Sequence, residues 1–366
     1  MTSKERITRM FEHQEADRVP ITDDPWPGTL ARWKREGMSE GVDWRDYFGV
    51  DKIDLFTVDN SPRYEVKILE ETDSYVISTT PWGVTLRNFK VTGVEKRQAG
   101  GQVGESDTTP EFLDYKVNTP EMWEEAKKRM TISRDRINWD YYKENFPKSR
   151  AMGSFIEAEF WFGFDVLHSH MAGTDTILIA MLEDPEWVKD MFKTYLDTTI
   201  GLFEIVWDAG YRFDCVKWPD DMGYKQRTFF SNELYAEVLQ PFHKKAVDWA
   251  HNRGIKTRLH SCGDIMTRVP QLIEIGIDAL NPIEVKAGMD LLALKRNYGD
   301  KLVLHGGTDA LIFDKPEKVL PYIEHTLPIV KERGGYIFSS DHSIPNTVSL
   351  DTYKQIVAAV KKYGAY

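Results

Sequence analysis

A histidine and a cysteine stand two residues apart in the segment LHSCG, as His260 and Cys262. The run that leads into this pair, Lys256–Ser261, has the apolar and β-branched residues of a strand. Residues two apart in an extended chain point to the same side, so this imidazole and this thiol can reach one metal ion. The pair alone is also compatible with a core histidine beside an inert thiol, and its surroundings decide between the two.

Three further strands are predicted to end in reactive side chains. The residues at or after those ends are Asp220, Asp221, Glu284, Asp341 and His342. The C-terminal strand ends of a (β/α) barrel meet on one face, so these groups are expected beside His260 and Cys262. Imidazole, thiolate and carboxylate ligands together are typical of zinc, whereas magnesium and calcium prefer oxygen ligands alone. The sequence therefore predicts a catalytic zinc ion at this face.

The elements that must position these residues follow a repeated pattern. Apolar or β-branched runs are each followed by a polar turn and a longer segment of helical periodicity, which is typical of βα units. The eight predicted strands are Arg18–Thr22, Ile53–Val58, Ala151–Phe155, Phe213–Trp218, Lys256–Ser261, Ala279–Glu284, Leu302–Gly306 and Tyr336–Ser340. The clearest predicted helices are Asp184–Ala209, Ser231–Arg253, Thr267–Ile275, Asp290–Tyr298, Pro316–Arg333 and Leu350–Tyr363. We therefore predict an α/β fold, a (β/α)₈ TIM barrel.

One stretch departs from this pattern. Residues 63–104 contain three alternating segments, EVKILEE, SYVISTT and GVTLRNFKVTG, separated by turn residues. They predict a small β meander that is inserted after the second barrel strand. No repeat or linker calls for a second domain, so residues 1–366 are predicted to form a single TIM-barrel domain.

Composition narrows the classes of function. The formal net charge of −11 is spread along the chain, and no block of Lys or Arg indicates binding of nucleic acid or of a membrane surface. No apolar stretch is long enough for a membrane span or a signal peptide, which predicts a cytoplasmic protein. The two cysteines, Cys215 and Cys262, are too few for a disulfide framework. Cys215 lies within a predicted strand and is expected to be a buried, inert thiol.

A set of segments spread along the chain carries a family resemblance. They are RVPI, WKREGM, YFGVDK, VKWPDDMG, LHSCGDI, LIEIGIDALNPIEV, LHGGTD and VSLDTYKQIVAAVKKYG. In these segments the chain resembles the uroporphyrinogen decarboxylase superfamily over nearly its whole length. Within it, the chain resembles the branch of zinc-dependent, corrinoid-linked methyltransferases, of the O-demethylase methyltransferase I type. The resemblance implies a barrel fold and a methyl-transfer activity.

Two departures from the family pattern bear on the substrate. Uroporphyrinogen decarboxylase carries an Arg-Gln-Ala-Gly-Arg loop where this chain, after Val19-Pro20, has ITDDPWPGT. Without paired arginines, a substrate with many carboxylates lacks an anchor. The methyltransferases that activate thiols carry a second cysteine ligand far downstream, where this chain has Asp341 and His342. With one thiolate, zinc is a better Lewis acid toward an oxygen ligand, which favours activation of a methyl donor.

The resemblance also implies a ligand set. Cobalamin-independent methionine synthases, which are distant relatives in zinc chemistry, take a glutamate ligand some way after the His-x-Cys pair, and Glu284 falls at a similar place. The implied metal ligands are His260, Cys262 and Glu284, with His342 as a fourth candidate and Asp341 as its competitor.

One functional hypothesis and several alternatives follow. The chain is expected to remove the methyl group of a methoxylated substrate, an aryl methyl ether, and to transfer it to the cob(I)alamin of a separate corrinoid protein. The alternatives are a methyltransferase acting on methanol, a methylamine or a thiol, a decarboxylase of the uroporphyrinogen type, and a non-catalytic barrel that binds a metal or a corrinoid protein. No corrinoid-binding Asp-x-His-x-x-Gly signature occurs in this sequence, so cobalamin is expected on the partner. Formation of a homodimer stays open.

Roles follow for particular side chains. The candidate catalytic residues are Asp220, Asp221 and His342, and either aspartate could orient ring substituents or supply a proton. The candidates for a flat substrate pocket are Trp26, Phe160, Trp161 and Trp218, for each of which core packing is the competing explanation.

Three other histidines have more ordinary expectations. His168 and His170, in LHSH, could be metal ligands by their spacing, but we expect them to cap a helix or to lie at the surface. His305 ends a predicted strand, where it either faces the substrate or forms a structural hydrogen bond.

Overall fold

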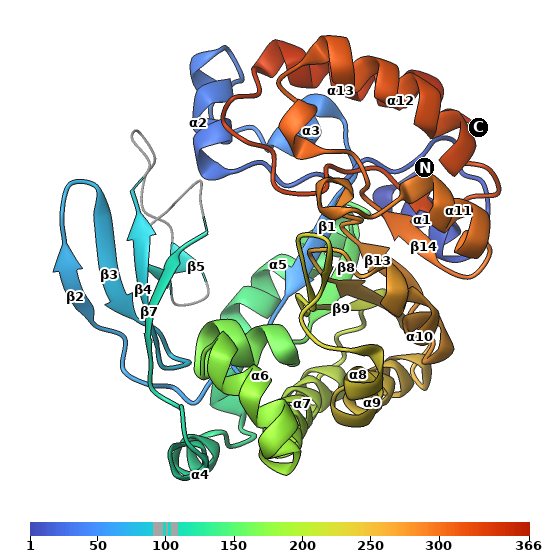
Figure 1. Ribbon diagram of the computed structural model, residues 1–366. Helices are drawn as coiled ribbons and strands as arrows, with labels where there is room; N and C mark the ends of the chain where they lie inside the picture. Colours follow the sequence, from blue (N-terminus) through green and yellow to red (C-terminus); the bar gives the residue numbers. More distant parts are fainter. Residues whose placement is uncertain (91–97, 100–101, 104–108) are drawn as a thin grey trace.

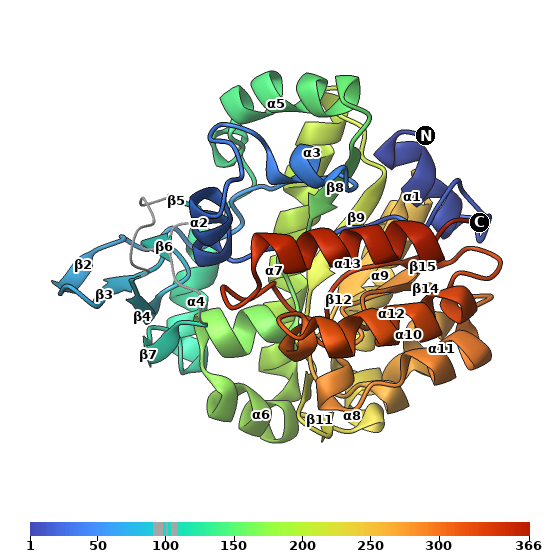
Figure 2. The same ribbon diagram turned by 90° about the horizontal axis from the view of Figure 1, so that it is seen from above.

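A seven-stranded parallel sheet forms the centre of the fold in a computed structural model, which describes residues 1–90, 98–99, 102–103 and 109–366. The strand order is β1-β8-β9-β12-β13-β14-β15, and every neighbouring pair is parallel. The strands are β1 Ile53–Phe56, β8 Phe155–Glu159, β9 Cys215–Pro219, β12 Lys256–His260, β13 Ala279–Asn281, β14 Val303–His305 and β15 Tyr336–Ile337. The sheet is curled, and helices lie around it (Figures 1 and 2).

The helices form where apolar residues recur at helical spacing. In α13, for example, Leu350, Tyr353, Ile356, Val357 and Val360 lie on one face and are buried. The helices are α1 Ser3–Phe11, α2 Pro27–Arg35, α3 Trp44–Phe48, α4 Pro120–Arg129, α5 Trp139–Ala151, α6 Thr174–Glu183, α7 Pro185–Asp208, α8 Asn232–Val238, α9 Gln240–His251, α10 Val269–Glu274, α11 Leu291–Tyr298, α12 Pro316–Val330 and α13 Leu350–Tyr363. In Figure 2, α11, α12 and α13 run along the same side of the sheet.

The predicted first strand, Arg18–Thr22, is not a strand in the structure. Ile21 makes a single parallel bridge with Phe338, and its carbonyl accepts a hydrogen bond from the Asp51 N–H at 2.8 Å. The segment therefore lies between the two edges of the sheet without joining them by a ladder, and Pro20 within it has no N–H to donate. Within the described residues the sheet has seven strands and is open. The predicted closed (β/α)₈ barrel is corrected to a curled α/β sheet.

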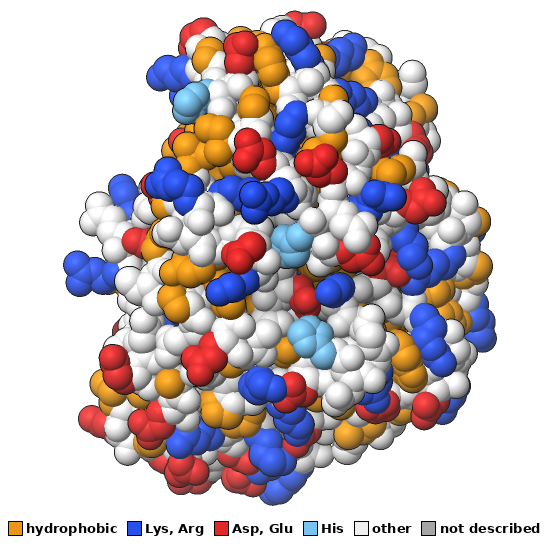
Figure 3. All heavy atoms as spheres, turned by 90° about the vertical axis from the view of Figure 1, so that its right-hand side faces the viewer, with side chains coloured by type: hydrophobic (Ala, Val, Ile, Leu, Met, Phe, Trp, Pro, Cys, Tyr) orange, Lys and Arg blue, Asp and Glu red, His pale blue; other side chains and the backbone are white. Residues whose placement is uncertain are grey.

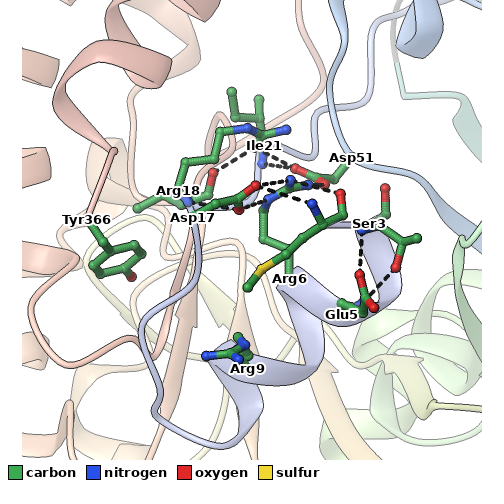
Figure 4. A network of polar contacts seen from close by, with 12 residues as sticks. Ser3, Glu5, Arg6, Arg9, Asp17, Arg18, Ile21, Asp51 and Tyr366 are labelled. Atoms are coloured by element: carbon green, nitrogen blue, oxygen red, sulfur yellow. Dashed lines mark hydrogen bonds and ion pairs between the residues drawn. The ribbon is translucent and has the colours of Figure 1, made fainter.

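The buried carboxylate of Asp51 accepts a backbone hydrogen bond that would otherwise be available to a neighbouring strand (Figure 4). The Ile21 N–H donates to Asp51 at 2.9 Å, and Arg18 donates to the same carboxylate at 2.7 Å. Arg6 of α1 also donates to Asp51, and it donates to Asp17 at 2.6 Å and 2.7 Å. Because a buried charge needs such partners, this network fixes the N-terminal segment against the start of β1.

An antiparallel sheet projects from the parallel one (Figure 1). Its strands pair in the order β2-β3-β4-β7, and they are β2 Ile68–Glu71, β3 Tyr75–Thr79, β4 Val84–Phe89 and β7 Glu111–Tyr115. Two short hairpins, β5 Gln98–Ala99 with β6 Gln102–Val103 and β10 Gly223–Tyr224 with β11 Arg227–Thr228, complete the strands of the described residues. The meander predicted for residues 63–104 lies partly outside the described residues, and β7 comes after its predicted end.

Two predicted elements shift for reasons that are local. The strand predicted at Ala151–Phe155 begins only at Phe155, because Ala151 still belongs to α5 and Gly153 turns the chain at a φ of +71°. The carboxyl end of this strand is therefore Glu159. The predicted helix Ser231–Arg253 is split into α8 and α9 near Leu239, just before the proline of α9.

Charged side chains of both signs are interspersed on the face shown in Figure 3. No helix in the described part of the chain is both long enough and apolar enough to cross a membrane.

Candidate functional site

Three side chains with metal-binding atoms lie together at the carboxyl edge of the parallel sheet. His260 is the last residue of β12, Cys262 follows it, and Asp221 follows β9. The His260 Nε2 atom lies 3.5 Å from the Cys262 Sγ atom and 3.7 Å from the Asp221 Oδ1 atom. The ligand atoms of all three residues lie within 4.8 Å of one another. We refer to Asp221, His260 and Cys262 as the ligand cluster, because these groups can converge on one ion.

Hydrogen bonds orient two members of the ligand cluster. The His260 Nδ1 atom lies 2.6 Å from the Asn281 Oδ1 atom. Because an amide oxygen accepts, the proton of the neutral ring belongs on Nδ1, which leaves a lone pair on Nε2 for a metal. The Cys262 N–H donates to the Asp221 Oδ1 atom at 2.8 Å, which fixes this carboxylate beside the thiol.

Gly263 explains how the loops after β9 and β12 can meet. Its φ of +83° lies in the left-handed region that favours glycine. A Cβ atom at this position would lie 2.1 Å from the carbonyl carbon of Gly223, which is shorter than any real contact. The glycine of LHSCG therefore allows the two loops to touch backbone to backbone, and Asp221 reaches Cys262 across this contact.

Solvent still reaches part of the ligand cluster. The side chains of His260 and Asp221 are 29% and 34% exposed. Burial, and then the charge of Lys217, lowers the pKa of His260 to about 4, so the ring is neutral at pH 7. Burial, and then the charge of Asp165, raises the pKa of Asp221 to about 7. Burial also raises the pKa of the Cys262 thiol well above its usual range. Carboxylates gathered around a thiol in this way suit a bound cation.

Glu284, which the family resemblance implies as a ligand, lies beside the ligand cluster. Its Oε2 atom accepts the Gly263 N–H at 2.6 Å, and its Oε1 atom lies 3.5 Å from the Lys286 Nζ atom. Its charge contributes to the raised pKa of Cys262. The residues whose ligand atoms all lie within 4.8 Å of one another include Asp221 but not Glu284. Asp221 is thus the carboxylate that lies close enough to His260 and Cys262 to share an ion with them. Glu284 accepts a hydrogen bond from a backbone N–H instead.

Asp341 and His342, the candidates for a fourth ligand, follow β15. Asp341 is buried and accepts hydrogen bonds from the Ala310 N–H at 2.9 Å and the Lys286 N–H at 3.4 Å. The His342 ring lies 5.9 Å from the ring of Trp26, a predicted substrate-binding residue. Neither residue belongs to the ligand cluster. Asp341 therefore links loops, while His342 lies next to Trp26.

Asp220, predicted as a catalytic residue, is fully buried. Its Oδ2 atom lies 2.7 Å from the His243 Nε2 atom, and the His243 Nδ1 atom lies 3.0 Å from the Tyr235 hydroxyl. Its Oδ1 atom accepts the Asp165 N–H at 2.8 Å. A carboxylate enclosed by these partners cannot contact a substrate. In the structure Asp220 holds the segment that begins at Asp165, and its catalytic role stays a prediction.

Two of the aromatic residues predicted to bind substrate belong to the core. Phe160 and Trp218 are fully buried, and the Phe160 ring stacks on Phe203 with ring centres 5.0 Å apart. For Trp218 the physical reason is alternation along β9, because side chains next to each other in a strand point to opposite faces. Their neighbours Trp161 and Lys217 are the ones that keep contact with solvent.

Trp161 lines an open cleft of about 740 Å³. Its walls come from the ends of β1 and β8, the turn between β3 and β4, and the segment that leads into α5. Its lining includes Thr57, Asp59, Thr80, Trp82, Arg136, Tyr141, Glu159, Trp161 and His170. The Trp161 ring lies 5.2 Å from the Trp82 ring and 4.9 Å from the His170 ring. We call this the aromatic cleft.

One strand, β9, separates the strand that carries Glu159 of the aromatic cleft from the strand that carries His260. Glu159 lines the cleft and forms an ion pair with Lys217. Lys217 in turn lies close enough to His260 for its charge to lower the pKa of that ring. Lys217 of β9 therefore lies on the strand between β8, which carries Glu159, and β12, which carries His260.

Sequence reasoning missed Trp82 and His170. Trp82 lies in the Pro-Trp-Gly turn of the antiparallel sheet, and the packing of that sheet against the rest of the fold cannot be deduced from local pattern. His170 belongs to a π-helical turn, Val166–Met171. Such turns occur frequently at functional sites. The signal that could have found His170 is the histidine pair of LHSH, which begins three residues after the aromatic run FWFGF.

The other histidines have structural contacts. The His168 ring stacks on Phe164 at 4.4 Å, and its Nδ1 atom lies 3.1 Å from the Thr174 hydroxyl. The buried His305 lies with its Nε2 atom 2.7 Å from the Thr22 hydroxyl. Of the two expectations for His305, the structural hydrogen bond is the one observed.

Comparisons with known proteins bear on the fold and the family. The family model for uroporphyrinogen decarboxylase (URO-D) matches residues 151–363. A solved structure of a methyltransferase from Methanosarcina mazei is similar with a TM-score of 0.65 and 14% identity, over 99% of this chain and 99% of that chain. This likeness concerns the fold. An endo-1,4-beta-xylanase, XylE, from Penicillium canescens reaches a TM-score of only 0.37 at 11% identity, over 64% of this chain and 83% of that chain. No curated protein matches the chain.

Proposed function

The chain belongs to the uroporphyrinogen decarboxylase family, and on that premise we propose that it is a zinc-dependent methyltransferase. The proposed substrate is a methoxylated compound, an aryl methyl ether, and the proposed methyl acceptor is the cob(I)alamin of a separate corrinoid protein. The observation that supports this most strongly is the ligand cluster of Asp221, His260 and Cys262 at the carboxyl edge of the parallel sheet.

The proposed metal ligands are the His260 Nε2 atom, the Cys262 Sγ atom and an Asp221 oxygen, with Glu284 as the alternative carboxylate. A mixed set of nitrogen, sulfur and oxygen donors fits zinc better than magnesium or calcium. Three protein ligands leave a position open for a substrate, as in catalytic zinc sites. Bound zinc would supply a Lewis acid toward the ether oxygen, which becomes a phenolate when the methyl group leaves.

The chain's own residues prepare this site. Asn281 keeps the His260 Nε2 lone pair available. Lys217, which forms an ion pair with Glu159, helps to keep the pKa of His260 low and its ring neutral. The carbon–oxygen bond breaks with its electron pair left on the oxygen, and the phenol is released after protonation. Asp220 supports the site indirectly, through the Asp165 N–H.

Decarboxylation of a porphyrinogen is the second candidate, because of the family to which the chain belongs. The segment ITDDPWPGT supplies Asp23 and Asp24 where paired arginines would bind a substrate with many carboxylates. Asp23 accepts hydrogen bonds from the Ser340 N–H at 2.7 Å and from the Tyr353 hydroxyl at 2.8 Å, so it is fixed in this position. Carboxylates disfavour an anionic substrate, and we therefore favour methyl transfer.

Metal analysis and a methyl-transfer assay on the full chain test the proposal. We expect stoichiometric zinc, and methylation of cobalamin from a methoxylated aromatic, followed by cobalt absorbance, only when a corrinoid protein is added. Cys262→Ala should lose both zinc and methyl transfer, because it removes the thiolate ligand. Cys215→Ala is the matched control and should keep both, because Cys215 is fully buried in β9.

Two results would contradict the proposal. One is full turnover by protein from which zinc has been removed with a chelator. The other is release of carbon dioxide from a porphyrinogen with no transfer of methyl groups to cobalamin.

A further inference from the structure

Ser261 lies between the two metal-binding residues of LHSCG and points away from the ligand cluster. Side chains next to each other in an extended chain point to opposite sides, so Ser261 is directed differently from His260 and Cys262. Its hydroxyl oxygen accepts the Met222 N–H of the loop after β9 at 3.0 Å. Ser261 is only 2% exposed, and the proposed reaction assigns it no role.

The ladder of backbone hydrogen bonds between β9 and β12 ends just before Ser261. Its last bond runs from the Asp220 N–H to the His260 carbonyl at 2.7 Å. The Ser261 N–H donates to the Asn281 carbonyl of β13 at 2.8 Å instead. The loop after β9 then reaches Met222, which is fully buried. Because a buried N–H group needs an acceptor, the Ser261 hydroxyl oxygen takes the place of a backbone carbonyl.

Hydrogen bonds in opposite directions fix Asp221. Both of its neighbours are held by the LHSCG segment, since the Asp220 N–H donates to the last carbonyl of β12 and the Met222 N–H donates to Ser261. In return the Asp221 carboxylate accepts the Cys262 N–H at 2.8 Å. The backbone on either side of Asp221 and the carboxylate itself are therefore all bonded to the segment that carries the other two members of the ligand cluster.

We propose that Ser261 is a positioning residue for the metal site, which holds the loop that carries Asp221 against the segment that carries His260 and Cys262. This inference rests on the proposed function, in which Asp221 is a metal ligand, and it adds a residue that acts through Asp221. Ligands that are held in place before the metal arrives lose less conformational freedom when it binds.

Loss of the Ser261 hydroxyl should therefore act on one ligand of the three. The Met222 N–H would have no acceptor, so the loop after β9 and the Asp221 carboxylate would move more freely. The His260 ring would stay in place, because it is hydrogen-bonded to Asn281 of β13 and not to that loop.

A double-mutant cycle on the full chain tests whether Ser261 acts through Asp221. Zinc affinity is measured by competition with a chromophoric chelator for the wild type, Ser261→Ala, Asp221→Asn and the variant with both substitutions. Ser261→Ala should weaken zinc binding about tenfold when Asp221 is present, as expected for a residue that orients a ligand. In the Asp221→Asn background it should weaken zinc binding by less than about twofold. A residue with a general structural role would cost the same factor in both backgrounds.

Amide hydrogen exchange of the metal-free full chain gives a measurement that does not depend on zinc. Ser261→Ala should speed exchange of the Met222 N–H, which loses its acceptor, and of the Cys262 N–H, whose acceptor is carried by the released loop, each by about tenfold. Exchange of the residue 261 N–H, which is bonded to Asn281 of β13, should change by less than about twofold.

A buried serine far from the site provides the matched control. Ser149, on α5, is 4% exposed, and Ser149→Ala should leave zinc affinity and the exchange of the Cys262 N–H unchanged. Thermal unfolding of each variant checks that it folds. Ser261→Gly, which also lacks the hydroxyl, replaces Ser261→Ala if the latter does not fold.

Two results would overturn the inference. One is an equal loss of zinc affinity on Ser261→Ala in both backgrounds, and the other is unchanged exchange of the Cys262 N–H in Ser261→Ala. If the wild type binds no zinc, the proposed function fails, and the exchange measurement alone decides whether Ser261 holds the loop that carries Asp221. If the wild type binds zinc and transfers methyl groups but the losses are equal, the proposed function stands and the role of Ser261 fails.

Discussion

Asp220 and Asp221 are neighbours after the same strand, yet their surroundings are opposite. Asp220 is fully buried, and its two oxygens are bonded to His243 and to the Asp165 N–H. Asp221 is 34% exposed and lies beside His260 and Cys262. The contrast shows that two adjacent residues after one strand can have different roles. The partly exposed residue can be reactive, whereas the buried residue supports the structure. Reading both aspartates as catalytic overlooks this division.

The residues around Asp220 and those around Asp221 are therefore expected to have different roles, in stability and in metal binding. Asp220, His243 and Tyr235 form a chain of buried hydrogen bonds, which we call the closed chain. Each of these side chains is bonded to the next, so the hydrogen bonds contribute to stability. In the ligand cluster the His260 Nε2 atom lies close to the Cys262 thiol, and the side chains of His260 and Asp221 are partly exposed to solvent. Substitutions in the first group should therefore change folding, and those in the second should change metal binding.

The largest expected effect on folding comes from breaking the closed chain. Asp220→Ala leaves His243 buried without its partner, so we expect the free energy of unfolding to fall by about 3 kcal/mol. Asp221→Asn, at a partly exposed position, should change it by less than about 1 kcal/mol. Tyr235→Phe removes only the last hydrogen bond and should cost about 1 kcal/mol. Urea unfolding of the three variants measures this, and equal losses for Asp220→Ala and Asp221→Asn would remove the contrast.

Zinc affinity should show the reverse order among carboxylates. Asp221→Asn removes a proposed ligand and should weaken zinc binding by more than about 100-fold, beyond the loss seen for outer hydrogen-bond partners. Glu284→Gln should weaken it by about tenfold, because Glu284 is held on the Gly263 N–H and acts on the site from outside. Competition with a chromophoric chelator measures both affinities. A larger loss for Glu284→Gln would make Glu284 the ligand and Asp221 its support.

The pH dependence of stability at Asp23 gives a test with a smaller expected effect, on another buried and hydrogen-bonded carboxylate. Burial raises its pKa from 3.8 to about 6, even though Ser340 and Tyr353 donate hydrogen bonds to it. A folded-state pKa above the unfolded value means that the folded protein holds the proton more tightly. The wild type should therefore lose stability relative to Asp23→Asn as the pH rises from about 4 to about 6. Urea unfolding of both proteins across this window measures the difference, and a constant difference would show that the pKa of Asp23 is not raised.

The second half of the fold could be predicted well from local patterns. The predicted strands Lys256–Ser261 and Leu302–Gly306 correspond to β12, Lys256–His260, and β14, Val303–His305. Apolar runs between helix-ending glycines are local signals, and they do not depend on the partner element. The first half was harder. The segment Arg18–Thr22 lacks a ladder because the Asp51 carboxylate occupies the Ile21 N–H, a contact between residues thirty positions apart in the chain.

The sequence by itself determined that His260 and Cys262 can face one ion, because two residues at this spacing in an extended chain point the same way whatever surrounds them. Only the tertiary structure decided that Asp221 completes the ligand cluster, because this depends on the contact between Gly263 and Gly223. It also decided that Trp82 and His170 share a cleft, because the antiparallel sheet must first pack against the rest of the fold. Spacing along one strand is local information, whereas the choice of neighbour across two loops depends on how the whole chain packs.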